Sequence, residues 1–201
     1  MPKISEEQRA ERIDRILAGA RRCFAQYGYE GATVARLEEE IGLSRGAIFN
    51  WFPSKEELFV ELARRDNHRL LSLFADEGFE ALVRAVTEED ADWLAVYLEF
   101  GRRLRADPDF RQQWQERAAP GVRERVHSLL QAGQAEGSVR DDLTVDQLGR
   151  FLGLVVDGIV VQRGMGFDPP DADAVVVLAE DAIAPRGARR RRAQRKASSA
   201  A

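Results

Sequence analysis

The sequence predicts an all-α fold, and three observations support this prediction. Apolar residues recur at spacings of three and four along most of the chain, which is the period of one buried helix face. No segment shows the sustained alternation of apolar and polar residues that is typical of a half-buried strand. Glycine, proline and N-cap residues separate the periodic segments, and we find no internal repeat.

The first predicted helix begins after Ser5, which forms a capping box with Gln8. Gly28 and Gly31 end it and permit a turn. Cys23 lies on its apolar face, so we expect a small core residue rather than a reactive thiol. The apolar positions of this face are Ile13, Ile16, Leu17, Ala20, Cys23, Phe24 and Tyr27.

Two short helices follow. Thr33 is a good N-cap for a helix that ends at Ile41, and Gly42 suits the left-handed position that stops it. Ser44 caps the next helix, from residue 45 to about 51. Two short helices joined by a tight glycine-containing turn, after a longer helix, predict a tri-helical helix-turn-helix.

Pro53 breaks the chain, and Ser54 with Glu57 forms a capping box that opens a fourth helix reaching about Phe74. The segment over 110–136 is predicted as one long helix with a kink at Pro120-Gly121. Further helices are predicted over residues 79–86, 92–105, 145–163 and 172–184.

Composition limits the classes of function. With 201 residues and 44% hydrophobic side chains, the chain can form one large domain or two small ones. No run of about 18 apolar residues is present, so we expect no membrane contact. The N-terminal residues are charged where a signal peptide needs an apolar stretch, which predicts a cytoplasmic location. With only Cys23, His68 and His127, a disulfide is excluded and a metal site is not expected.

Charge divides the chain into three parts. Residues 1–69 carry 12 basic and 12 acidic side chains, residues 70–184 carry 11 and 22, and residues 185–201 carry 7 basic side chains and no acidic one. An acidic middle repels polyanions, so a nucleic-acid contact has to come from one of the ends. The basic tail, 185–201, is predicted to be disordered, and either adds non-specific DNA affinity or keeps the protein soluble.

The stretch ATVARLEEEIGLSRGAIFNWFPSKEELF, residues 32–59, resembles the DNA-binding segment of TetR-family regulators. This resemblance implies a helix-turn-helix domain over residues 1–54, followed by an all-α effector-binding and dimerisation domain over 55–184. Within the family, residues 19–49 and the sequence LRADPDF, residues 104–110, are similar to the aconitase repressors of actinobacteria.

The resemblance implies that the helix opened by Ser44 enters the major groove. Arg45 then reaches a guanine edge or a phosphate, and the small Gly46 and Ala47 let the helix backbone approach the DNA. Thr33 and Lys55 are expected to hold phosphates, Thr33 through its hydroxyl and the helix dipole. Outside this motif, Arg45 and Lys55 are more simply interpreted as solvated surface charges.

Three further positions of the same predicted site, Phe49, Asn50 and Trp51, depart from the family pattern, which commonly has Tyr, then His or Tyr. Phe49 lacks the hydroxyl that would touch a phosphate, which favours a packing role. Asn50 keeps a donor and an acceptor, and Trp51 either offers its indole N–H to the DNA backbone or belongs to the core.

For the remaining helices the family implies a homodimer whose last two helices pair with those of a second copy, and an effector site. Asp157 is the only charge in residues 151–161. A buried carboxylate is costly unless it is paired, so we expect Asp157 either to pair with Arg102 or Arg103 or to contact a ligand.

Residues on the helix of Trp93 are candidates for an effector pocket, against the simpler interpretation of a solvated helix edge. We predict ligand contacts from Trp93, Tyr97, Glu99, Arg102, Arg103, His127 and Asp157. The likeness to aconitase repressors suggests a carboxylate metabolite such as citrate with Mg²⁺, bound by paired hydrogen bonds from arginines. No cofactor is expected to be required.

The prediction is therefore a dimeric repressor, released from a pseudopalindromic operator when an effector shifts the fourth helix. Operator position decides between repressor and activator. The rival interpretation is a helical small-molecule carrier or enzyme without a DNA role. Against it, the chain has none of the motifs GxGxxG, GxxxxGK[ST], GxSxG and HExxH, and we predict that it is not an enzyme.

Overall fold

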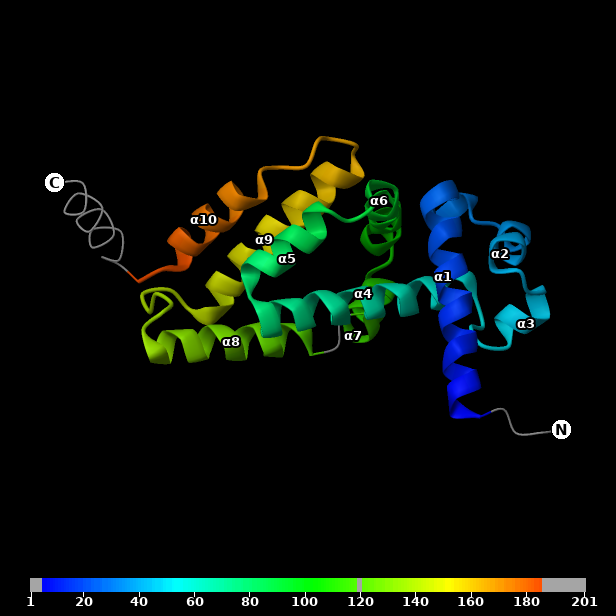
Figure 1. Ribbon diagram of the computed structural model, residues 1–201, viewed down its shortest axis with the longest axis horizontal. Coiled ribbons are helices and arrows are strands. Elements are labelled where there is room, and N and C mark those ends of the chain that lie inside the picture. The colour runs from blue at the N-terminus through cyan, green and yellow to red at the C-terminus, as the bar shows by residue number, and fades with distance from the viewer. Residues whose placement is uncertain (1–4, 119–120, 186–201) are drawn as a thin grey trace. The chain divides into compact units, whose positions relative to one another are not determined.

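The computed structural model describes residues 5–118 and 121–185, and every regular element in these ranges is a helix (Figure 1). The helices are α1 (Glu6–Gly31), α2 (Val34–Ile41), α3 (Arg45–Phe49), α4 (Lys55–Glu77), α5 (Phe79–Thr87), α6 (Ala91–Ala106), α7 (Pro108–Ala118), α8 (Val122–Glu136), α9 (Val145–Gly164) and α10 (Ala172–Ile183). The all-α prediction is confirmed. None of these helices is long and apolar enough to cross a membrane.

Local side-chain chemistry sets most helix ends where the sequence predicts them. Ser5 and Gln8 form a complete capping box at the start of α1. Thr33 and Ser44 are the N-caps of α2 and α3, since each side chain accepts a hydrogen bond from a backbone N–H three residues on. Gly42 ends α2 with φ 69°, a left-handed conformation that glycine adopts without strain.

Two differences from the sequence prediction stand out. The segment predicted as one kinked helix over 110–136 forms two helices, α7 and α8, and α8 begins after Gly121, whose φ is 69°. Pro120 and the predicted basic tail beyond residue 185 lie outside the described residues. The recognition helix α3 ends at Phe49, so Asn50 and Trp51 lie in the turn that follows.

The chain divides into two compact units. The first contains α1 to α3, α4 as far as Arg69, the chain from Glu89 through α7, and the segment Val161–Asp168. The second contains Leu70–Glu88, α8, α9 as far as Val160, and α10. Packing therefore groups α6 and α7 with the helix-turn-helix, whereas the functional boundary expected at residues 54 and 55 stays a prediction.

Each unit has its own core. The first core is rich in aromatic residues, with Phe24, Phe59, Trp93 and Phe100 almost fully buried and in ring contact with one another or with neighbouring rings. Cys23 is fully buried in it, as expected, and burial raises the pKa of its thiol to about 11. The second core is mainly aliphatic. Its buried residues are Phe79, Val83, Val86, Leu130, Leu148, Leu152, Ile159, Val176 and Ala179.

Candidate DNA-binding site and effector residues

Helices α1 and α2 form a close-packed base for α3. Leu37 and Ile41 of α2 are buried, and Gly19 of α1 lies directly against Ile41. A Cβ added at Gly19 would lie 2.8 Å from the Ile41 Cα, closer than real Cβ atoms approach other atoms. Only glycine permits this spacing. Gly19 therefore allows α2 and the turn that follows α2 to lie close to α1 (Figure 1).

The short helix α3 has one buried and one open face. Ile48 is fully buried, whereas Arg45, Gly46 and Asn50 are exposed. A Cβ added at Gly46 would meet nothing within 4 Å, so open space lies beside the helix backbone at this position. This face can therefore approach a partner surface closely.

Hydrogen bonds hold the turn that precedes α3. The Glu38 carboxylate accepts a hydrogen bond from the Arg45 backbone N–H, and Ser44 Oγ accepts one from the Ala47 N–H at 3.4 Å. Arg15 Nη2 of α1 donates to the Gly42 carbonyl at 3.3 Å. These contacts fix the start of α3 while the Arg45 side chain stays in solvent.

Phe49 and Trp51 are half-buried and pack against the first core. The Arg9 guanidinium lies over the Trp51 ring, 5.4 Å from its centroid. Of the alternatives left open by the sequence, the geometry favours a packing role for both aromatic residues. Thr33 is exposed at the N-terminus of α2, where its hydroxyl already accepts a hydrogen bond from the Arg36 N–H at 3.4 Å.

Lys55 is half-buried at the first position of α4. Its Nζ donates a hydrogen bond to the Tyr29 carbonyl at 2.8 Å and lies 4.5 Å from the centroid of the Tyr29 ring. The Lys55 ammonium group, predicted to bind a phosphate, therefore contacts Tyr29 at the end of α1 in this structure.

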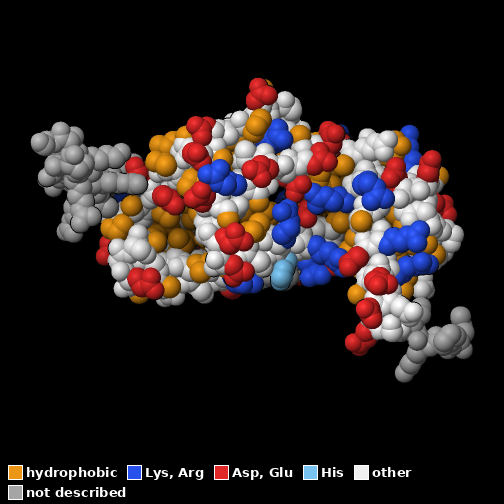
Figure 2. Space-filling view, in the orientation of Figure 1, with side chains coloured by type: hydrophobic (Ala, Val, Ile, Leu, Met, Phe, Trp, Pro, Cys, Tyr) orange, Lys and Arg blue, Asp and Glu red, His pale blue; other side chains and the backbone are white. Residues whose placement is uncertain are grey.

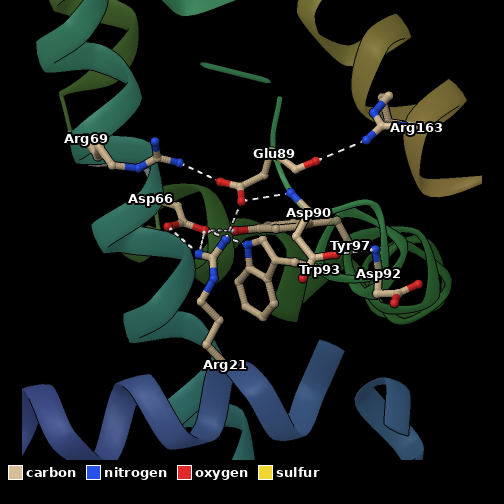
Figure 3. Close-up of polar contacts among 9 residues, drawn as sticks. All are labelled: Arg21, Asp66, Arg69, Glu89, Asp90, Asp92, Trp93, Tyr97 and Arg163. Carbon is tan, nitrogen blue, oxygen red and sulfur yellow. Dashed lines mark hydrogen bonds and ion pairs between the residues drawn. The ribbon is translucent and has the colours of Figure 1, made fainter. Parts of the chain in front are cut away.

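Two predicted effector residues, Trp93 and Tyr97, turn toward a carboxylate of the protein itself (Figure 3). Asp66 Oδ2 accepts hydrogen bonds from Trp93 Nε1 at 2.7 Å and from Tyr97 Oη at 3.3 Å. Arg21 Nη1 of α1 donates to both Asp66 oxygens at 3.0 Å. Burial and the adjacent Asp66 charge raise the pKa of Tyr97 well above its usual range, so Tyr97 stays a hydrogen-bond donor.

A second carboxylate, Glu89, extends this cluster. It accepts hydrogen bonds from Arg21 Nη2 at 2.8 Å and from Arg69 Nη2 at 2.7 Å. Its backbone carbonyl accepts one from Arg163 Nη2 at 3.3 Å (Figure 3). Asp66 and Arg21 were not predicted from the sequence, although a helical signal exists: Asp66 follows Phe59 and Leu62 at spacings of seven and four, on the buried face of α4.

The other predicted effector residues of α6 have separate surroundings. Glu99 Oε2 accepts a hydrogen bond from the Tyr29 backbone N–H at 2.8 Å. Arg103 forms an ion pair with Glu56 of α4 and lies over the Phe110 ring, 4.5 Å from its centroid. Arg102 is exposed. Trp93, Tyr97, Glu99 and Arg103 thus make contacts within the first unit.

His127 and Asp157 belong to the second unit. His127 is half-buried on α8, and Asp157 is exposed on α9 in the single chain. Asp157 is therefore not a buried carboxylate in the single chain, and its contact with a ligand stays a prediction. Its apolar surroundings nevertheless remove enough water to raise the pKa of its carboxyl.

The comparisons with known proteins agree with this arrangement. Residues 16–62 match the family described as "Bacterial regulatory proteins, tetR family", and residues 60–186 match "BetI-type transcriptional repressor, C-terminal". The chain belongs to the TetR family. It is 45% identical over 185 residues to the HTH-type transcriptional repressor Rv1474c of Mycobacterium tuberculosis, covering 91% of this chain and 98% of that protein.

A second TetR-family relative, the HTH-type transcriptional repressor AcnR of Corynebacterium diphtheriae, is 42% identical over 185 residues, covering 91% of this chain and 97% of AcnR. Among solved structures, GusR of Salmonella enterica has the same fold, with a TM-score of 0.70, 20% identity, and coverage of 90% of this chain and 96% of GusR. The family prediction is confirmed, as is the closer likeness seen in residues 19–49.

This TetR-family chain is a transcriptional repressor rather than an enzyme, as the family and its named relatives indicate. The rival interpretation of a carrier or enzyme without a DNA role is therefore excluded. Within residues 5–118 and 121–185, no group of three or more His, Cys, Asp or Glu side chains is arranged to hold a metal ion.

Proposed function

We propose that this repressor binds a pseudopalindromic duplex DNA site as a homodimer and reads it with α3 in the major groove. The observation that carries the proposal is the open face of α3 and the turn after it, where Arg45, Gly46 and Asn50 are exposed while Ile48 is buried in the core. A helix whose exposed side carries an arginine and a glycine can approach base edges without a steric barrier.

In this proposal the DNA contacts come from two groups of residues. Arg45 and Asn50 supply hydrogen bonds to bases or phosphates, and the small residues Gly46 and Ala47 let the helix backbone approach the DNA. Thr33 and Ser44 contact phosphates at the starts of α2 and α3. Phe49 and Trp51 support this surface from the core side, which agrees with their burial.

The proposed dimer uses α9 and α10. Leu154 of α9 is 64% exposed, and Val177 and Leu178 of α10 are 51% and 66% exposed. Orange apolar side chains are visible over α10 in Figure 2. Exposed apolar side chains in such number are typical of a surface that a partner covers. A second copy would place two α3 helices about 34–36 Å apart, the spacing of successive major grooves.

The proposed signal is a small molecule that binds one dimer geometry better than the other and so releases the DNA. A carboxylate metabolite such as citrate with Mg²⁺ remains the proposed effector, with the exposed Arg102 as its first candidate contact. The proposed site of action is the cytoplasm. The proposed route for the signal is α4, whose first residue, Lys55, contacts the end of α1 and whose residues after Arg69 belong to the second unit.

The test is selection of bound fragments from the source genome, followed by affinity measurements with Arg45→Ala. Loss of a direct base contact is expected to weaken binding by roughly tenfold or more and to relax the preference at one base pair per half-site. Arg105→Ala is the matched control, because Arg105 is an exposed arginine at the end of α6. Equal affinity of both variants for the selected site would contradict the proposed role of α3.

A further inference from the structure

We propose that Lys55 and Glu99 are positioning residues for the DNA-reading helices, and that they act by holding the backbone of Tyr29 between α4 and α6. The proposal rests on the proposed DNA binding. It assigns to Lys55 and Glu99 roles other than the phosphate contact and the effector contact expected from the sequence.

We call the contacts of Glu99 and Lys55 with the Tyr29 backbone the clamp. Its first part, Glu99, acts where the helical path of α1 is interrupted. Gly28 has φ 70° and ψ 172°, so the helical path is interrupted and Tyr29 begins a new last turn. The first N–H groups of a helical turn have no intrahelical acceptor and need a partner from elsewhere. Glu99 Oε2 of α6 supplies it, accepting the hydrogen bond from the Tyr29 N–H at 2.8 Å. A carboxylate from another helix thus takes the part of an N-cap.

Gly28 is what allows the Glu99 carboxylate to come so close. A Cβ added at Gly28 would lie 2.6 Å from Glu99 Oε1 and 2.7 Å from Oε2. The positive φ at Gly28 is itself a conformation that L-residues rarely adopt. The backbone conformation therefore requires glycine at residue 28, and a Cβ there would also displace the Glu99 carboxylate from the Tyr29 N–H.

The second part of the clamp acts on the carbonyl of the same residue. Lys55 Nζ donates to Tyr29 O at 2.8 Å, and the ammonium group also lies over the Tyr29 ring. A hydrogen bond from a charged donor and a cation–π contact reinforce each other here. A lysine that reaches toward a phosphate would have to give up both contacts, so the geometry favours the internal role.

The Tyr29 side chain completes the attachment. It is 4% exposed, and its ring contacts Phe59 of α4 at 5.3 Å and Phe100 of α6 at 4.9 Å between centroids. Phe100 is the neighbour of Glu99, so α6 holds both the backbone and the ring. Thr33, the N-cap of α2, follows Tyr29 by only four residues. The direction in which α2 and α3 leave α1 is therefore set at Tyr29.

The salt dependence of DNA affinity separates a positioning lysine from a phosphate-binding one. Each lost phosphate contact lowers the slope of log affinity against log salt by about 0.9. For Lys55→Met we expect roughly tenfold weaker binding, with a slope change below about 0.3. Lys55→Arg keeps the charge but not the single-point ammonium geometry at the Tyr29 carbonyl and ring, so it is expected to restore affinity only if Lys55 contacts a phosphate. Affinities are compared well below each variant's melting temperature, so that unfolding does not contribute.

Glu99→Ala gives an independent test with the opposite electrostatic expectation. Removal of a negative charge alone would tighten DNA binding, whereas loss of the clamp is expected to weaken it by roughly tenfold. Glu116→Ala is the matched control, because Glu116 is an exposed carboxylate on α7 that contacts Gln112. The double variant Lys55→Met with Glu99→Ala is expected to bind DNA at most twofold more weakly than either single variant, since both substitutions act on Tyr29.

Several results would overturn the proposal. A slope change near 0.9 for Lys55→Met, restored by Lys55→Arg, would make Lys55 a phosphate contact. DNA affinity of Glu99→Ala equal to that of Glu116→Ala would remove the role of Glu99. Amide hydrogen exchange over residues 24–36 tests the clamp without DNA: Glu99→Ala is expected to speed exchange there, and unchanged exchange would refute it. Absence of DNA binding by the unmodified protein would instead refute the proposed function.

Discussion

The two compact units of this repressor hold their helices together by different kinds of contact. In the first unit, aromatic rings meet at defined angles and Asp66 is held by groups from α1 and α6. Ring pairs and charge-assisted hydrogen bonds are directional, so they fix helix orientation as well as distance. In the second unit, aliphatic side chains dominate, and their burial is favourable without a preferred direction.

This difference corresponds to what each unit has to do in the proposed mechanism. A DNA-reading surface needs a fixed relation between α1, α2 and α3, and directional contacts supply it. Like the first unit at Met165 and Phe167, the second unit leaves large apolar side chains in solvent, with Leu154 and Leu178 more than three-fifths exposed. Its full stability is expected to depend on a second copy that covers them.

The largest effect is expected from Phe59→Ala. Phe59 is fully buried, and its ring contacts six others: Phe24, Tyr29, Trp93, Tyr97, Phe100 and Trp114. Removing a buried phenylalanine costs about 3–5 kcal/mol in the free energy of unfolding. Urea unfolding measures the loss. Phe74→Ala, at a half-buried ring of the second core, is the control and is expected to cost less.

An equal loss for Phe59→Ala and Phe74→Ala would contradict the contrast between the two cores. The comparison is fair because both side chains have the same size and both lie on α4. They differ in burial and in the number of neighbouring rings, and both differences make the larger cost expected at Phe59.

The next effect is expected from Asp66→Asn. The Asp66 side chain is 15% exposed, and the amide removes the negative charge and one of the two oxygens that Arg21 Nη1 contacts, while Arg21 Nη2 keeps its ion pair with Glu89. Breaking a fully buried pair costs about 3–5 kcal/mol, and partial exposure reduces this to about 2 kcal/mol. Thermal unfolding measures it, with the exposed Asp109→Asn as control. A loss no larger than that of the control would mean that the cluster in Figure 3 is not a structural link.

The helices themselves could be predicted because their signals are local. Capping side chains such as Ser5 and Ser44, and the left-handed Gly42, act within a few residues and are visible in the sequence. The division between α7, which ends at Ala118, and α8, which begins at Val122, was predicted only as a kink, because proline followed by glycine in the sequence is compatible with both a bent helix and two helices.

The site could be predicted only in part, for a physical reason. The open face of α3 follows from the motif, but the partners of Lys55 and Glu99 lie 26 and 70 residues away in the chain. A sequence pattern shows that a charge lies on a helix face and not which distant carbonyl or N–H it meets. Trp93 and Tyr97 were assigned to a ligand pocket for the same reason, since their polar partner Asp66 belongs to another helix.

A smaller effect, on assembly rather than folding, is expected from Leu178→Glu. A charged side chain in the proposed interface is expected to weaken dimerisation at least tenfold, which corresponds to about 1.4 kcal/mol. Sedimentation at several concentrations measures the dimer, and circular dichroism checks that the helices persist. Ala135→Glu, at an exposed position of α8, is the control. A dimer unaffected by Leu178→Glu would place the interface elsewhere.

The smallest effect, expected from Asp157→Asn, tests the same face by its pH dependence. The raised pKa of Asp157 means that the folded protein binds this proton more readily than the unfolded chain, whose ordinary value is 3.8. The contribution of Asp157 to stability is therefore fully present at low pH and is lost as pH rises through the raised pKa.

In a dimer that covers Leu154 and Asp157 together, the charged form is disfavoured further. Asp157→Asn is thus expected to tighten the dimer by roughly two- to threefold at pH 7, and this gain should disappear toward pH 4. A weaker dimer at pH 7 would instead show that the carboxylate accepts a cationic partner across the interface, and the open face of α9 would then be a site of ionic rather than apolar pairing.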